Sequence, residues 1–242
     1  MISYILPVYN CSREFEAGLP VFVEVVKGLG YPFELVVIDD GSLDGAEVRR
    51  AAEAFGCVYV RNERNRGKGY AVKRGMGLAK GELLIFMDGD FPFQPDVAGR
   101  MIRVLEQGGY EMAIGDRTLE DSRYAKDIPF MRKAGSTVLS FIAGHFFTPG
   151  FYDTQCGIKG FRREAAMRIF GVMTLSGFSF DIELLHIALK NGFSIARVPV
   201  ETKKQLSSNV RILIHGTGML GALLKITFND LFGRYRVVSG GR

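Results

Sequence analysis

The chain has 242 residues, of which 47% are hydrophobic and 24% charged, and its formal net charge is +5. This composition is typical of a globular protein, and its mild basicity favours anionic partners. Three scattered cysteines (Cys11, Cys57 and Cys156) argue against a disulfide framework and for a reducing compartment. No window approaches 18 uncharged apolar residues and no signal peptide is recognisable, so we expect a cytoplasmic protein that lies at most on a membrane surface.

Apolar runs alternate with helical patterns along the first half of the chain. The runs predict strands at 3–9, 33–39, 57–62, 82–88 and 111–117, and the patterns predict helices at 13–29, 44–55, 70–79 and 96–107. This alternation predicts an α/β fold with a Rossmann-like, mostly parallel sheet that carries helices on both faces. Ligands bind such sheets outside the carboxyl ends of the strands.

The second half of the chain is less regular. We expect a helix over 130–147, a loop with a short strand over 153–163, a helix over 181–190 and a strand over 195–202. An amphipathic helix is expected from 209 to 232. The helices at 130–147 and 209–232 are suited either to a membrane interface, to packing on the sheet or to a dimer seam.

Two acidic pairs follow predicted strands. Asp88 and Asp90 lie on the same side of an extended chain, where their oxygens suit Mg²⁺ or Mn²⁺ bound to a diphosphate. The alternative is a capped loop with Asp88 paired to a lysine. Asp39 and Asp40 precede a Gly-Ser turn, and one of them is a candidate for a ribose hydroxyl or a base N–H group. The alternative for that pair is an Asx turn that closes the strand.

The stretch NERNRGKGYAVKRG, residues 62–75, gathers cations around Gly67 and Gly69 at a predicted helix start. Backbone N–H groups there, together with Lys68, can hold a phosphate, although neither a P-loop nor a dinucleotide fingerprint is present. We interpret most of the arginines as a solvated face. Nucleic acid is not expected as a partner, because no aromatic stacking platform accompanies these charges. No motif for nucleophilic catalysis occurs either.

The motifs LPVYN, VVIDDGSLDG, NRGKGYAVKRGMGLAKGE, FMDGD, IGDR, DTQCGIKGF, FDIELL and PVET occur in this order. Over residues 2–210 the chain resembles the inverting GT-A glycosyltransferases of family 2. Within that family it is most similar to the polyprenyl-phosphate branch, which includes dolichyl-phosphate mannose synthases and glucosyltransferases. GKGYAVKRG and DTQCGIKGF carry this narrower resemblance.

The resemblance implies a role for each matching residue. Asp90, Arg117 and Lys203 would be catalytic, and Arg132 and Ser136 would hold the acceptor phosphate. Asp88 and Asp90 would bind a divalent metal, Mg²⁺ or Mn²⁺, with Gln94 as the candidate for a third ligand. The nucleotide-sugar would contact Pro7, Tyr9, Ile38, Asp39, Asp40, Lys68, Asp88 and Gly89.

Three positions depart from the family pattern. Cys11 stands in place of a glutamate, Pro92 in place of a glutamine metal ligand and Asn209 in place of a lysine. These changes favour a glucosyl-type donor, or another sugar, over GDP-mannose. They also leave open a damaged or a metal-independent site.

The resulting hypothesis is an inverting hexosyltransferase that moves a sugar from a UDP-glucose-type or GDP-mannose-type donor to a polyprenyl or dolichyl phosphate. Residues 1–117 would bind the donor, 118–205 the acceptor, and 206–242 would form an amphipathic segment at the cytoplasmic face of a membrane. A homodimer is a further expectation. The alternatives are a nucleotide-sugar-binding scaffold without turnover and a family 2 transferase with a non-lipid acceptor.

Overall fold

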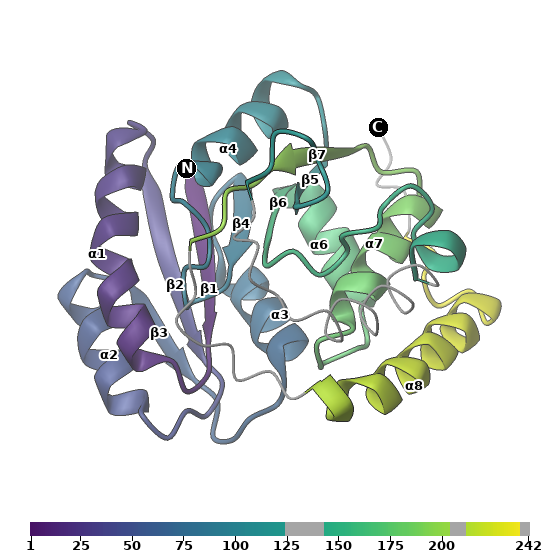
Figure 1. The fold of residues 1–242 in the computed structure, drawn as a ribbon, viewed down its shortest axis with the longest axis horizontal. Helices are drawn as coiled ribbons and strands as arrows, with labels where there is room; N and C mark the ends of the chain where they lie inside the picture. The colour runs from purple at the N-terminus through teal and green to yellow at the C-terminus, as the bar shows by residue number, and fades with distance from the viewer. Residues whose placement is uncertain (124–142, 204–211, 238–242) are drawn as a thin grey trace.

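The computed structural model describes residues 1–123, 143–203 and 212–237, with residues 212–217 described by their backbone alone. Figure 1 shows helices on both sides of one central sheet. In the described residues the sheet has seven strands in the order β3-β2-β1-β4-β6-β5-β7. The strands are β1 (Ile2–Val8), β2 (Phe33–Asp39), β3 (Val58–Arg61), β4 (Leu83–Met87), β5 (Met112–Asp116), β6 (Ile158–Arg162) and β7 (Ile195–Pro199).

The expected mostly parallel sheet is confirmed, and all the predicted strands are present within a few residues of their predicted ends. β6 is the exception in direction, because it runs antiparallel to both β4 and β5. The other strand pairs are parallel. The carboxyl ends of β1, β2, β3 and β4 therefore lie along one edge of the sheet.

The helices are α1 (Ser12–Gly28), α2 (Gly45–Ala54), α3 (Lys68–Leu78), α4 (Val97–Gln107), α6 (Arg163–Val172), α7 (Phe180–Lys190) and α8 (Ile212–Leu231). The sequence patterns did not predict α6. The helix expected over 130–147 falls largely on residues outside the described part, and its end forms the short π-helix η1 (Ala143–Phe147).

Two apolar cores cover the two faces of the sheet, because successive side chains of a strand point to opposite faces. In β1, Tyr4 and Leu6 pack in the core that also contains side chains of α1, α2 and α4. Ile5 points the other way and packs with Val72 and Met76 of α3. The second core also contains side chains of α6, α7 and α8.

α8 is attached to this second core by a buried polar cluster. The fully buried Glu183 carboxylate accepts hydrogen bonds from Tyr235 Oη at 2.6 Å and Thr174 Oγ1 at 2.7 Å. Asn229 of α8 donates to the same Tyr235 and Thr174 oxygens. Backbone N–H groups of Thr174 and Leu175 complete the shell around Glu183. The helix is therefore held to α7 and to the α6–α7 loop.

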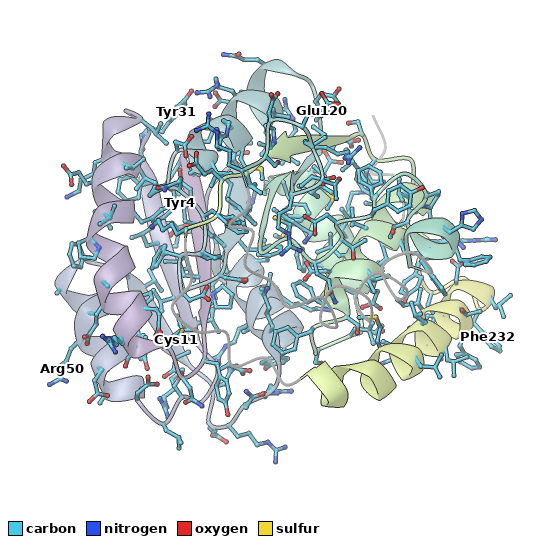
Figure 2. All side chains as sticks on the ribbon, in the orientation of Figure 1. Tyr4, Cys11, Tyr31, Arg50, Glu120 and Phe232 are labelled. Carbon is cyan, nitrogen blue, oxygen red and sulfur yellow. The ribbon has the colours of Figure 1, made fainter. Side chains whose placement is uncertain are left out.

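The exposed side of α8 is also apolar, so the helix is not simply amphipathic. Five large apolar side chains at helical spacing are each at least half exposed: Leu220, Leu224, Phe228, Leu231 and Phe232. Figure 2 shows the labelled Phe232 at the outer end of the helix. No helix in the described part of the chain is long and apolar enough to cross a membrane.

The division of the chain at residues 117 and 205 remains a prediction. In the sheet, β5 of the first segment pairs with β6 and β7 of the second segment. The two segments therefore share one continuous sheet.

Candidate active site

The DGD segment at the end of β4 lies against the end of β1. Gly89 N donates a hydrogen bond to Pro7 O at 3.2 Å. A Cβ atom at Gly89 would lie 2.6 Å from Val8 Cγ2 and 2.8 Å from Pro7 O. Only glycine fits this position, and its contact with β1 fixes the segment that carries Asp88 and Asp90.

Asp88 forms an ion pair with Lys68, which is the first residue of α3. Lys68 Nζ lies 2.6 Å from Asp88 Oδ1, and the two side chains are 14% and 30% exposed. Asp88 is also bounded by Gly157, where a Cβ atom would lie 2.1 Å from Asp88 Oδ2. Asp88 N donates to Gly157 O at 3.0 Å. The GKG and CGIKG motifs thus meet at the Asp88 carboxylate.

The glycines of the GKG motif let α3 begin close to the α6–α7 loop. Gly67 has φ +97°, and a Cβ atom there would lie 2.4 Å from Ser176 O. A Cβ atom at Gly69 would lie 2.7 Å from both Leu175 O and a side-chain atom of Phe180. A side chain at either glycine would push the start of α3, and Lys68 with it, away from this contact.

A second ion pair lies buried behind Lys68. Lys159 and Asp181 are at most 2% exposed, and Lys159 Nζ lies 2.5 Å from Asp181 Oδ1 and 3.0 Å from Cys156 O. Burial raises the pKa of Asp181, while Lys159 and Lys68 oppose this shift. Burial also opposes the charge of Lys68, but Asp88 and Asp181 outweigh it and raise the pKa of Lys68. Acidic and basic groups therefore alternate inward from Asp88.

Sequence reasoning did not identify Lys159 and Asp181. A signal was present, because each lies next to apolar residues of a buried strand or helix, in IKGF and FDIELL. A charged side chain in such a segment requires a partner.

The Asp90 carboxylate shares its surroundings with Asp88. Burial and the charge of Asp88 raise the pKa of Asp90 to about 6. Two carboxylates that repel each other at the end of a strand form a donor set that Mg²⁺ or Mn²⁺ accepts. Among the described residues no three His, Cys, Asp or Glu side chains gather. A metal held by Asp88 and Asp90 would thus take further ligands from other groups, such as phosphate oxygens, water or the Gln94 side chain.

The segment after β7 returns to the DGD loop. Lys203 N donates to Pro92 O at 2.8 Å, and Gln94 N donates to Glu201 O at 2.9 Å. These contacts bring the backbones of Lys203 and Gln94 close to the loop that carries Asp90. Partial burial lowers the pKa of Lys203.

Arg117, which follows β5, is oriented by Asp153 of the DTQCGIKGF motif. Its Nε and Nη2 atoms lie 2.9 Å and 2.6 Å from the two Asp153 carboxylate oxygens, and its backbone N–H binds the same carboxylate. The sequence motifs indicate Arg117 but do not indicate Asp153 as its partner.

Asp39 and Asp40 both bind groups of their own chain. The fully buried Asp39 accepts from Ser42 N, Tyr59 Oη and Arg61 Nη1. Asp40 accepts from Asn62 Nδ2, Arg66 N and Gly67 N. The Asp40 bonds fix the loop between β3 and α3, and the Asp39 bonds join the end of β2 to β3. The predicted contact of the pair with a nucleoside stays a prediction.

The remaining predicted contacts have different surroundings. Tyr9 is 49% exposed beside the end of β1, whereas Ile38 is fully buried with Val36 and Ala71 beneath α3. The acceptor residues Arg132 and Ser136, and the departure at Asn209, lie outside the described residues.

The sheet and the site together define a GT-A glycosyltransferase. Residues 3–170 match the sequence model of glycosyl transferase family 2, and the chain therefore belongs to that family. It is 27% identical over 252 residues to a dolichyl-phosphate beta-glucosyltransferase of Dictyostelium discoideum, covering 98% of this chain and 77% of the relative. It is 30% identical over 251 residues to a dolichyl-phosphate beta-glucosyltransferase of Trichomonas vaginalis, covering 98% and 75%.

Among solved structures, the fold resembles glucosyl-3-phosphoglycerate synthase from Mycobacterium tuberculosis in complex with Mn²⁺, UDP and glucosyl-3-phosphoglycerate. The TM-score is 0.67 at 20% identity, and the match covers 100% of this chain and 82% of that chain. This likeness supports the fold assignment.

Proposed function

We propose that this enzyme transfers glucose from UDP-glucose to a polyprenyl phosphate, with inversion at the anomeric carbon. The observation that carries the proposal is the cluster of Lys68, Asp88 and Asp90 at the strand ends, with Asp88 and Lys68 2.6 Å apart. Two relatives that are named dolichyl-phosphate beta-glucosyltransferases match nearly the whole chain. They support glucose as the sugar and a polyprenyl phosphate as the acceptor. The departures at Cys11, Pro92 and Asn209 also favour a glucosyl-type donor, or another sugar, over GDP-mannose.

In this proposal the donor lies across the ends of β1, β2 and β4. Its diphosphate faces Lys68, Asp88 and Asp90, with Gly89 beside it. Its base and ribose would lie in a pocket lined by Pro7, Tyr9, Ile38 and Asp40. Mg²⁺ or Mn²⁺, when bound by Asp88 and Asp90, would neutralise negative charge on the diphosphate. Gln94 is close enough along the loop to remain the candidate for a third ligand.

The reaction needs alignment and charge stabilisation rather than a strong base. A phosphate oxygen of the acceptor is already an anion at neutral pH, so it attacks the anomeric carbon directly. The bond from that carbon to the diphosphate breaks as the new bond forms, and UDP leaves from the opposite side. Arg117, oriented by Asp153, and Lys203 stabilise the developing charge. Arg132 and Ser136 would hold the acceptor phosphate.

We further propose that the enzyme lies on the cytoplasmic face of a membrane. The exposed apolar side chains of α8, from Leu220 to Phe232, would enter the interface beside Lys225, which is itself exposed. A homodimer that buries the same side chains is the alternative, and sedimentation with and without vesicles distinguishes the two.

Calorimetric titration of UDP, GDP and their glucose and mannose conjugates, with Mn²⁺, with Mg²⁺ and with chelator, tests the donor assignment. We expect metal-dependent binding of UDP and UDP-glucose, followed by UDP release when a polyprenyl phosphate is added. Preference for GDP-mannose would overturn the sugar assignment. Binding without turnover on any acceptor would instead favour a nucleotide-sugar-binding scaffold, and turnover on soluble acceptors alone would favour a non-lipid acceptor.

A further inference from the structure

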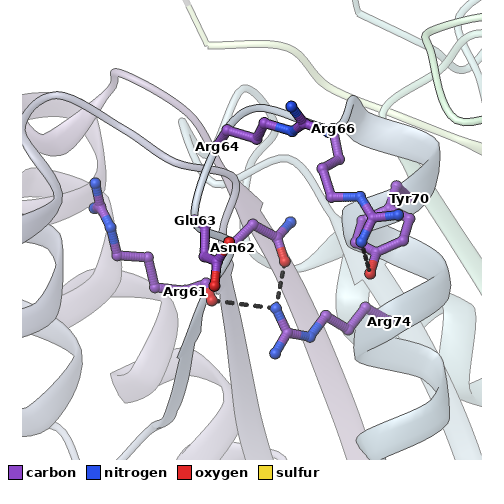
Figure 3. Close-up of a pocket in the computed structure, with 7 residues that line it drawn as sticks. All are labelled: Arg61, Asn62, Glu63, Arg64, Arg66, Tyr70 and Arg74. Carbon is purple, nitrogen blue, oxygen red and sulfur yellow. Dashed lines mark hydrogen bonds between the residues drawn. The ribbon is translucent and has the colours of Figure 1, made fainter.

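A hollow of about 770 Å³ lies between the end of β3 and the start of α3 (Figure 3). In the sheet, β3 is three strands away from β4, which corresponds to about 14 Å between strand axes. The residues that line the hollow are Arg61, Asn62, Glu63, Arg64, Arg66, Tyr70 and Arg74.

Tyr70 and Arg74 lie on one side of α3 because they are spaced four apart, and Arg66 lies in the loop that precedes the helix. Lys68 lies on another side of the helix and contacts Asp88. The Arg66 guanidinium lies 3.6 Å from the centre of the Tyr70 ring and donates to Tyr70 Oη. Arg74 Nη1 donates to Arg61 O at 3.1 Å and to Asn62 Oδ1 (Figure 3).

The loop between β3 and α3, which lines part of the hollow, is also fixed by hydrogen bonds to Asp40. Asp40, which is 3% exposed, accepts hydrogen bonds from the Asn62 side chain and from the backbone of Arg66 and Gly67. The arginines are thus presented by a rigid loop and a helix, which lowers the entropic cost of binding a ligand.

The charges in the hollow are not balanced. No acidic side chain of the described residues forms an ion pair with Arg64, Arg66 or Arg74, and Arg61 is paired with the buried Asp39. Glu63 is the acidic residue among the lining side chains. On α2, by contrast, Arg49 pairs with Glu53 and Arg50 with Glu47. The lining of the hollow therefore carries an excess of positive charge.

We propose that Arg64, Arg66 and Arg74 form a phosphate-binding site distinct from the Asp88 and Asp90 carboxylates, which follow a strand three positions away in the sheet. Guanidinium groups bind phosphate oxygens in pairs, and an anion at this point would gain charge-assisted hydrogen bonds from more than one of them. The ligand is a phosphomonoester or diphosphate group, carried either by an anionic lipid headgroup or by a soluble molecule. The β3–α3 loop lies at the lower side of Figure 1, the same side as the start of α8. This inference does not depend on the identity of the sugar or of the acceptor.

The test compares the wild type with the double variant Arg64→Gln/Arg66→Gln and with the matched control Arg49→Gln/Arg50→Gln, which removes the same charge from α2. Pyrophosphate is titrated by calorimetry in the presence of chelator. Sedimentation with phosphatidylcholine vesicles, with and without phosphatidic acid, tests the lipid source. Equal melting temperatures establish that all three proteins are folded.

We expect the double variant to lose at least about tenfold in affinity for pyrophosphate or for the phosphatidic-acid vesicles, while the control keeps the wild-type affinity. A loss in the pyrophosphate arm alone identifies a soluble ligand, and a loss in the vesicle arm identifies a lipid headgroup. Equal affinities in the double variant and the control overturn the proposal, and so does an oligonucleotide that binds the hollow more tightly than either phosphate probe.

Discussion

The ammonium of Lys68 lies 2.6 Å from the Asp88 carboxylate, and this ion pair joins the GKG turn to the DGD loop. The GKG turn begins α3 and the DGD loop follows β4, and each is fixed by glycines that contact other backbone segments. Behind Lys68 the pair of Lys159 and Asp181 continues the alternation of charge into the core. The position of Lys68 is thus set from three elements: α3, β4 and the start of α7.

Asp90→Asn should abolish turnover without unfolding the protein. The amide keeps the shape of the side chain but removes the charge that holds a cation beside the diphosphate, and we expect kcat to fall by about 10²-fold or more. The measurement is UDP release with a polyprenyl phosphate acceptor. Asp121→Asn, at an exposed position, is the control. Normal turnover in the Asp90 variant would remove this residue from the reaction.

Metal-dependent donor binding should weaken as the pH falls through 6. The pKa of Asp90 is raised to about 6, so below that pH the carboxyl group must lose a proton before it can bind a cation. We expect about tenfold weaker binding for each pH unit below 6. Calorimetry at a series of pH values measures this slope, and a flat profile between pH 5 and about 7 would contradict it.

The raised pKa of Asp90 also predicts that its carboxylate lowers the stability of the metal-free protein. Because the folded-state pKa lies above the ordinary value of 3.8, the cost is present above pH 6 and is lost as the pH falls toward 3.8. Asp90→Asn should therefore melt a few degrees higher than the wild type at pH 7. The difference should disappear near pH 4, as measured by thermal unfolding with chelator present. A lower melting temperature of the variant at pH 7 would refute this.

Gly157→Ala should weaken donor binding by moving Asp88. The added Cβ atom would lie 2.1 Å from Asp88 Oδ2, so the carboxylate must turn away from its present position. The matched control is Gly171→Ala in α6, where a Cβ atom meets nothing within 4 Å. We expect the control to bind UDP-glucose normally and to be slightly more stable, because alanine favours a helix over glycine. Unchanged binding of UDP-glucose by the Gly157 variant would mean that donor affinity does not depend on the orientation of the Asp88 carboxylate.

Tyr235→Phe should loosen α8. The substitution removes the hydroxyl that donates to Glu183 and accepts from Asn229, and leaves both buried groups with one partner fewer. We expect a loss of about 1–3 kcal/mol in the free energy of unfolding, measured by urea denaturation. Tyr152→Phe, at an exposed position, serves as the control and should change stability by much less.

The strands and most helices could be predicted because their apolar periodicity is local. The direction of β6 could not, since antiparallel pairing between β4 and β5 depends on residues far away along the chain. α6 was missed because it begins at Arg163, directly after β6, with Arg162 at the cap position where Ser, Thr, Asp or Asn would give a signal.

For the candidate site, too, residues with a local sequence signal could be identified, whereas their distant partners could not. The DGD segment and Lys68 could be identified from their sequence context, but the partners of Asp39 and Asp40 lie on β3 and the loop after it. No short-range pattern relates a carboxylate at the end of one strand to an arginine on the next. Likewise, Asp153 is found only when Arg117 is seen to bind it.

The placement of β5 has a consequence for the order in which the protein can fold during synthesis. Both hydrogen-bonding edges of β5 are occupied by strands that begin only at Ile158 and Ile195. When the ribosome has released the chain as far as Asp116, this apolar strand has no partner in the sheet, and unpaired strand edges promote aggregation. Pairing must wait for later residues, so a nascent chain stalled near residue 117 should require a chaperone to remain soluble.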